Sequence, residues 1–574
     1  MPVPVIRRML AGIGALAAIP LGGALAQSGP TTHKHYEESP EANKPSPTGE
    51  LAPRLQKLGT HAFPVTTKSK QAQLFMNQGL NLTYGFNHAE AGRAFREAAR
   101  LDPGCAMAYW GQALVLGPNI NAPMDAANEP KAHELAQKAA GLKSKVSARE
   151  QALIDAVALR YSGQTNDREA RNKAYANAMK AVTRRFPNDL DIATLYVESV
   201  MDLRPWGYWM PDGAPYEGTA EIATLTESII KRDPKHPGAL HLYIHLMEPT
   251  TTPEKAEAAA DTLSPLMPAA GHIIHMASHI YQRVGRYADS VKSNETAALA
   301  DEDYITQCRA QGFYPMAYYP HNVHFLWFAA TMDGRGQLAI DSARKVASKV
   351  SDEALKQLPL LAGFRVVPYY ALTRFGRWDE MLKEEAPPAD NLFMTGTWHY
   401  ARGQAFLGKG QWLEAQRELE QLRAIAADKN LEFPLFSPNL ASTILGIAPE
   451  VLSGELALAR KDYDTAIAHL ETAVRMEDGL VYTEPSEWHY PARHALGAAL
   501  LAAGRARQAE TVYWEDLKRN RENGWALFGL ASAIEAQGRK EQAALIRARF
   551  EKAWARADFK LTASRLAGSA SGDD

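Results

Sequence analysis

The stretch HIIHMASHIYQRVGRY places histidines at positions 272, 275 and 279 of the chain. Spacings of three and four residues put His272, His275 and His279 within about 60° of arc, on one face of a helix. Imidazole is a common ligand of zinc, copper and iron, and two rings one helical turn apart can share an ion. A lone histidine on a helix is more often a hydrogen-bonded structural residue, so this stretch by itself leaves metal binding and packing open.

Related histidine pairs precede and follow this stretch. The segments HLYIHL and HNVHF each supply one pair, namely His241 with His245 and His321 with His324. The first pair lies 34 residues before His275 and His279, residue for residue. The region from 241 to 324 contains seven of the 17 histidines in the chain. This recurrence predicts three neighbouring helices that present imidazoles at matching levels, which is a metal-site geometry.

Other side chains are secondary candidates. Glu248 falls on the face of His241 and His245 and would add one carboxylate ligand. Met276 lies beside His272 on the helical wheel, and its thioether suits copper, although a methionine at this spacing is more often core. Tyr281 is a candidate hydrogen-bond donor or redox-active group, with packing as the simpler interpretation.

A weaker constellation lies far along the chain in VYTEPSEWHYPARHALG. It offers four side chains that bind metals elsewhere: Glu484, Glu487, His489 and His494. A solvated turn followed by the start of a helix is the favoured interpretation of this segment, and His494 remains a secondary candidate.

The types of donor atom limit which metals could bind. A set rich in imidazole with at most one carboxylate disfavours calcium and magnesium, which prefer oxygen. Copper is favoured, with zinc or iron as alternatives, and the number of histidines exceeds what one zinc ion needs. Two copper ions with three imidazoles each would form a site for oxygen chemistry. The sequence has no phosphate loop, serine nucleophile elbow, zincin helix or Cys-x-x-Cys pair, so in an enzyme the metal would carry the reaction, with an oxidoreductase as our guess.

An internal repeat positions these helices. Small and apolar residues recur at fixed offsets in GLNLTYGFNHAEAGRAFREAARLDP, namely Gly79, Ala91, Phe95, Ala98 and Pro103. Further copies begin at Gly403, Gly454 and Gly497, and a lengthened copy begins at Gly524. These offsets resemble the tetratricopeptide repeat, whose small residues let two antiparallel helices approach closely.

The resemblance implies an all-α fold, a right-handed superhelical solenoid of antiparallel helix pairs over residues 65–561. In that family positions 2, 5, 9 and 12 of the first helix line a concave groove. The turn at Gly285 places the three histidines of the first stretch at positions 2, 5 and 9, and the neighbouring copies place the other four there too. The usual role of the family, a metal-free scaffold that binds a protein or peptide in its groove, is the alternative to a metal site.

The ends of the chain depart from the repeat. Residues 1–26 have the pattern of a signal peptide cleaved after Ala26, which predicts a periplasmic or secreted protein. Two arginines at 7 and 8 leave general and twin-arginine export open. Residues 27–64 are expected to form a flexible polar and Pro-rich lead-in, and residues 562–574 a disordered tail.

Composition limits the remaining function classes. The formal net charge of −2 gives no indication of a nucleic-acid binder, and no stretch beyond the leader is apolar for the roughly 18 residues of a membrane span. Cys105 and Cys308 cannot form a disulfide framework, and two buried thiols are favoured over one bridge. The aromatic insertion at 203–218 is expected to pack on the solenoid rather than stack on a ligand.

Overall fold

The computed structural model describes residues 44–566, apart from 211, 309, 311–313 and 436–437. The expected signal peptide, the lead-in up to residue 43 and the tail from residue 567 lie outside the described residues. Within the described residues the chain is helical, with three isolated β-bridges and no strand. The expected all-α class is confirmed.

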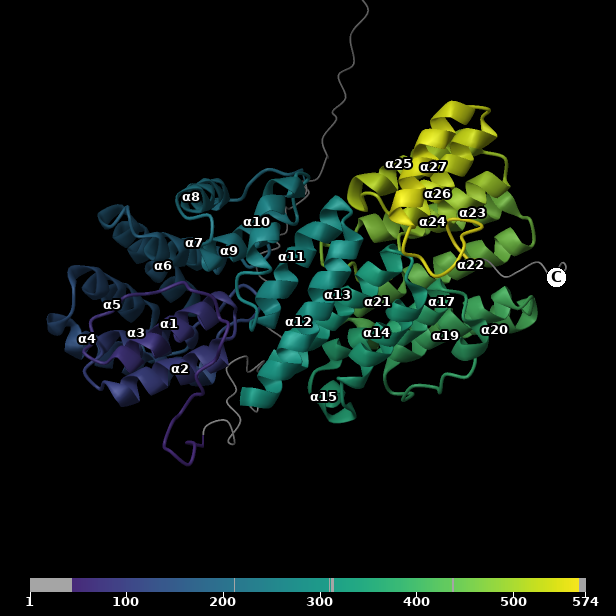
Figure 1. Ribbon diagram of the computed structural model, residues 1–574. Helices are drawn as coiled ribbons and strands as arrows, with labels where there is room; N and C mark the ends of the chain where they lie inside the picture. Colours follow the sequence, from purple (N-terminus) through teal and green to yellow (C-terminus); the bar gives the residue numbers. More distant parts are fainter. Residues whose placement is uncertain (1–43, 211, 309, 311–313, 436–437, 567–574) are drawn as a thin grey trace, which may run out of the picture. The chain divides into compact units, whose positions relative to one another are not determined.

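The helices follow one another closely along the chain (Figure 1). The first nine are α1 (Lys70–Tyr84), α2 (His88–Leu101), α3 (Ala106–Val115), α4 (Glu129–Leu142), α5 (Ala148–Arg160), α6 (Arg168–Arg185), α7 (Leu190–Met201), α8 (Thr219–Arg232) and α9 (Pro237–Met247). The next nine are α10 (Glu257–Leu263), α11 (Gly271–Val284), α12 (Tyr287–Cys308), α13 (Tyr319–Met332), α14 (Gly336–Ser348), α15 (Asp352–Gln357), α16 (Ala362–Arg365), α17 (Val367–Arg374) and α18 (Trp378–Met381). The last are α19 (Leu392–Gly408), α20 (Trp412–Ala426), α21 (Ala441–Leu445), α22 (Ile447–Ala459), α23 (Tyr463–Asp478), α24 (Ala492–Ala502), α25 (Ala506–Arg519), α26 (Gly524–Ala536) and α27 (Lys540–Ala553).

Successive helices pack against each other as pairs. The helices α1 and α2, α11 and α12, α19 and α20, and α22 and α23 are in contact along their lengths. Short turns join the two members of each pair, so the members run antiparallel (Figure 1). The chain is therefore an all-α solenoid of antiparallel, tetratricopeptide-like helix pairs.

The repeated glycines stand where two helices touch. A Cβ added to Gly79 would lie 2.4 Å from the ring of Phe95, and one added to Gly497 would lie 2.4 Å from the ring of Tyr513. Any side chain there would separate α1 from α2, or α24 from α25. Close helix approach is thus the physical reason for the small residue that the sequence repeats.

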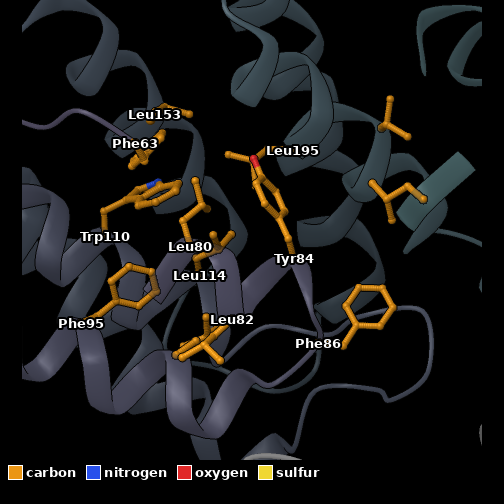
Figure 2. Packing of buried hydrophobic residues seen from close by; sticks show 14 of the residues in the cluster. Phe63, Leu80, Leu82, Tyr84, Phe86, Phe95, Trp110, Leu114, Leu153 and Leu195 are labelled. Carbon is orange, nitrogen blue, oxygen red and sulfur yellow. The ribbon is translucent and has the colours of Figure 1, made fainter. Parts of the chain in front are cut away.

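Apolar side chains from consecutive helices form several buried clusters along the chain. Figure 2 shows one part, in which Trp110 of α3 lies beside Phe63 and Leu80. The ring centroids of Phe63 and Trp110 are 5.7 Å apart, and Phe63 is fully buried. The end of the expected lead-in therefore packs against the helices. At the other end Ser564 is also buried, because its hydroxyl bonds to Tyr513.

The aromatic insertion packs onto α9. Trp209 Nε1 donates to the backbone oxygen of Leu246 at 2.7 Å, and Tyr208 is buried. Trp206 remains 40% exposed and lies at the candidate site described below. Cys105 and Cys308 are both buried, and they do not form a disulfide with each other.

One helical stretch of the described residues has the length and hydropathy of a membrane span. It runs from Ala441 to Ala459, and 78% of it is buried inside the protein. That burial is what an apolar helix in a protein core shows.

Candidate metal centre

Three first helices of successive pairs carry the predicted histidines. The helix α9 packs on α11, and α11 packs on α13. The close packing of α12 on α11 depends on Gly271, because a Cβ there would lie 2.0 Å from Asp301 Oδ1. The helix α11 ends at Gly285, whose φ of +82° suits glycine, and Arg286 N–H donates to Tyr281 O at 2.8 Å.

His241, His245 and His272 form the first group. One nitrogen of each lies within 4.8 Å of the others, and the Nε2 atoms of His241 and His245 are 3.1 Å apart. His241 Nδ1 lies 2.6 Å from the backbone oxygen of Tyr84, and His245 Nδ1 lies 2.9 Å from Glu248 Oε1. Because both oxygens can only accept, the hydrogen bonds assign the proton of each neutral ring to Nδ1. Both Nε2 lone pairs therefore face a common point.

His275, His279 and His321 form a second group of the same design. One nitrogen of each again lies within 4.8 Å of the others, and the Nε2 atoms of His275 and His279 are 2.9 Å apart. His275 Nδ1 lies 2.7 Å from Asn294 Oδ1. The amide nitrogen of Asn294 donates to Ser290 O, so its oxygen is the acceptor and His275 Nδ1 donates. The lone pair of His275 Nε2 thus faces His279 Nε2, where a metal ion could replace the shared proton.

Burial keeps most of these imidazoles neutral. Burial, helped by neighbouring imidazoles, lowers the pKa of His241, His272, His275 and His321 well below its usual value. Burial also lowers the pKa of His245, although Glu248 opposes it. Two neutral lone pairs about 3 Å apart repel each other unless a proton or a metal ion lies between them. Ring nitrogens held in this way are typical of a metal site.

His272 is the least satisfied of the six rings. It is 2% exposed, and neither of its ring nitrogens has a hydrogen-bond partner. A buried polar group without a partner costs about 1–3 kcal/mol. A metal ion bound with His241 and His245 would remove that cost.

Two carboxylates surround His279. Its Nδ1 lies 2.5 Å from Glu248 Oε2 and 2.9 Å from Glu484 Oε2. Burial alone would lower the pKa of His279, but the two carboxylates outweigh it and raise this pKa to about 10. Burial and the charge of Glu248 raise the pKa of Glu484, whereas His279 and His245 outweigh burial and lower the pKa of Glu248. His279 is the protonated imidazole of the second group, and this proton must leave when a metal ion binds.

The two groups are adjacent and share a carboxylate. The ring centroids of His245 and His279 are 5.6 Å apart, and those of His272 and His275 are 5.9 Å apart. Glu248 contacts His245 with one oxygen and His279 with the other. Both of its oxygens face ring Nδ1 atoms, so neither oxygen points at the Nε2 atoms of the two groups. Glu248 therefore contacts the histidines from behind, whereas the sequence predicted it as a possible ligand of the same metal.

Aromatic side chains close the site. Phe86 lies 4.4 Å from His241, and Trp206 lies 5.1 Å from His245, ring centroid to ring centroid. Phe325 packs in the same way on the second group, 4.5 Å from His279. The five histidines on α9 and α11 are each no more than 2% exposed. At this level the groove expected from the resemblance is therefore filled by other parts of the same chain.

The structure leaves His324 outside both groups. Its ring packs 5.0 Å from Trp327 and 5.4 Å from Phe364, and burial lowers its pKa to about 3. His324 follows His321 on α13 but packs among these aromatic rings and does not reach the shared point. Its prediction as a ligand is wrong for these two groups.

The secondary candidates lie elsewhere as well. Met276 is a fully buried core residue, and the hydroxyl of Tyr281 donates to Asp261 at 2.8 Å. His494 accepts from Arg374 at Nδ1 and contacts Asp516 through Nε2 at 3.0 Å. With both nitrogens occupied, His494 has no lone pair for a metal.

Glu484 is the residue whose place the sequence did not reveal. Glu484 belongs to the weaker constellation with Glu487, His489 and His494, and no spacing rule connects it with His279. The segment that carries it reaches the site because Tyr482 donates to the backbone oxygen of Glu248 at 3.2 Å.

A further cluster consists of His61, Asp191 and His236, whose donor atoms are as close together as those of a metal site. Its ring protons are placed differently from those of the two imidazole groups. His236 Nδ1 accepts the backbone N–H of Ala239 at 3.2 Å, so its proton is on Nε2, which lies 3.3 Å from Asp191 Oδ1. His61 Nε2 lies 2.8 Å from the same oxygen. This cluster is a hydrogen-bonded network that caps α9.

No family model matches the chain, and no curated protein matches it. Among solved structures it is similar to the human IFIT1 dimer with m7Gppp-AAAA, at 12% identity and a TM-score of 0.31, covering 85% of this chain and 91% of that one. It is also similar to the APC/C heterotetramer Cut9-Hcn1, at 11% identity and a TM-score of 0.25, covering 85% of this chain and 97% of that one. Superpositions this distant carry no argument about function.

Proposed function

We propose that this protein binds two transition-metal ions side by side, one in each three-imidazole group. The first ion would be held by His241, His245 and His272. The second would be held by the corresponding group, His275, His279 and His321. Copper is the favoured metal, with zinc or iron as alternatives.

One observation carries the proposal. Each group contains a pair of histidines whose Nε2 atoms face each other, at 3.1 Å in the first and 2.9 Å in the second. In three of these four rings the Nδ1 atom has a hydrogen-bond acceptor that turns Nε2 toward the shared point. Oriented imidazoles with an acceptor behind them are the usual arrangement around a bound metal.

The donor set supports a nitrogen-binding metal. Each group offers three imidazoles and no thiolate, which suits copper, zinc and iron. Three protein ligands also leave a coordination position for water or a substrate. The expected export of the protein agrees with copper or zinc.

Burial favours a resident cofactor over a transported ion. The imidazoles lie beneath Phe86, Trp206 and the segment of Glu484, so a bound ion would exchange slowly. The sequence left a metalloenzyme and a role in metal handling open; two adjacent redox-active ions with open positions suit an oxidoreductase, and we propose that class. The scaffold alternative requires groove histidines that contact a partner, and these imidazoles are buried.

Elemental analysis of the full chain, purified from the compartment to which it is exported, tests the proposal. We expect stoichiometric transition metal, reduced in a His275→Ala/His279→Ala double variant. The matched control is His399→Ala/His469→Ala, because these histidines also lie on helices and bond to the carboxylates of Glu418 and Glu450. Copper, zinc, iron and manganese all at trace level would rule out the proposal.

A further inference from the structure

A third set of donor atoms lies on the far side of His279 from the second group. It consists of His279 Nδ1, Glu248 Oε2 and Glu484 Oε2, all within 4.8 Å of one another. The side chains of the three residues are 3%, 0% and 1% exposed. They come from α11, from the residue that ends α9 and from the segment between α23 and α24.

These atoms are close together without being aligned for hydrogen bonds. The distances from His279 Nδ1 are 2.5 Å and 2.9 Å, yet Nδ1, Glu248 Oε2 and both oxygens of Glu484 form no aligned hydrogen bond. Atoms that share a proton lie along the N–H axis. Atoms that share a tetrahedral metal lie around it, about 3.4 Å from one another when the metal–ligand distance is about 2.1 Å. The observed atoms lack the alignment of the first case, and a metal ion between them would require the distances of 2.5 Å and 2.9 Å to lengthen.

Few charged side chains contact the two carboxyl groups. Among the described residues, the ion pairs of Glu248 and Glu484 involve only His245 and His279. The nearby Arg283 donates instead to the backbone oxygen of Thr250 at 3.0 Å. Two buried carboxyl groups beside each other cannot both be ionised without cost, and either a proton or a metal cation compensates them.

The fold holds Glu484 in this place. Asn439 binds the backbone of Val481 through both its amide nitrogen and its oxygen, at 2.9 Å and 2.8 Å. Its amide also donates to Glu487 at 2.6 Å, and Tyr482 donates to Glu248 O. Glu484 is thus delivered to His279 by a segment that is fixed on both sides.

We propose that Glu248, His279 and Glu484 form a third cation site. Its two carboxylates and one imidazole suit a divalent ion that accepts oxygen ligands, such as zinc or manganese. This donor set is richer in oxygen than the two imidazole groups are. On binding, the Nδ1–H bond of His279 breaks, an Nδ1–metal bond forms, and the proton passes to solvent. If the second imidazole centre also binds its ion, the Nε2 proton of His279 would pass to solvent as well, and the two nitrogens of His279 would then hold both ions. Only this bridging role rests on the proposed function, since the third site needs no ion at Nε2.

Zinc titration of the chelator-stripped full chain tests this site. We expect three zinc ions per wild-type chain and two per Glu484→Gln chain, with unchanged circular dichroism. Glu487→Gln is the matched control, because it lies in the same segment and glutamine still accepts from Asn439, and it should retain three ions.

Each outcome separates the two proposals. Three ions in both wild type and Glu484→Gln would overturn the third site and leave the imidazole centres intact. A single wild-type ion that Glu484→Gln loses would support the third site and overturn the imidazole centres. No bound zinc would overturn both. Should Glu484→Gln fail to fold, a wild-type count of two would still overturn the third site.

Discussion

Replacing His272 by leucine should have opposite effects with and without metal. In chelator the variant loses a buried ring whose two nitrogens have no hydrogen-bond partner. Leucine fills a similar volume without a polar group. The unpaired ring costs about 1–3 kcal/mol, so the free energy of unfolding should rise by about that amount. For a chain of this length the gain is about 1–3 °C in melting temperature.

With metal the sign reverses. A ligand at 1,000 times its Kd stabilises the folded state by about 4 kcal/mol per site, and His272→Leu removes that gain at the first centre. The loss of about 4 kcal/mol exceeds the 1–3 kcal/mol that the variant gains by removing the unpaired ring. The variant should then melt below wild type by about 1–3 °C.

Differential scanning calorimetry in EDTA and in copper measures both effects. The control is His494→Leu, which removes a buried histidine whose nitrogens contact Arg374 and Asp516 and should destabilise the protein in both conditions. A lower melting temperature of His272→Leu in EDTA, or an equal gain from copper in variant and wild type, would refute the reasoning.

Four further outcomes are expected. Glu248→Gln should weaken metal binding by the first imidazole group by about 10- to 100-fold in isothermal titration, because Glu248 orients His245 there; an unchanged affinity of the first group would contradict that role. Asn294→Ala should weaken the second group only. His324→Phe should leave the metal content unchanged, since this ring packs among aromatics. The pKa of His279 is raised to about 10, so a proton competes with the metal ion below that pH. The metal affinity of the second group should therefore rise up to tenfold per pH unit between pH 7 and 9. The first group, whose rings are already neutral, should show no such rise.

Most of what the sequence predicted about the fold and the histidines follows from the spacing of the repeats. Glycines such as Gly79 and Gly497 identify the contact between paired helices, and the structure confirms that contact. The interval of 34 residues placed His241 and His245 level with His275 and His279 because neighbouring repeats are copies of one another. Local periodicity and copy number are properties that a single sequence contains.

Other parts of the site depend on contacts that no period encodes. His324 shares its helix with His321 but packs on Trp327 and Phe364, and the partners on either side of a helix are not readable from the spacing of its residues. Glu484 meets His279 through a segment from a distant repeat, and Phe86 reaches His241 from the turn after α1. Such placements follow from the three-dimensional packing alone.

Anomalous diffraction at the copper edge, from crystals of the metal-loaded protein, tests the central claim most directly. We expect two neighbouring peaks, one about 2.0–2.1 Å from the Nε2 atoms of His241 and His245 and the other at the same distance from those of His275 and His279. Absence of both peaks, or a peak only beside His61 and His236, would contradict it.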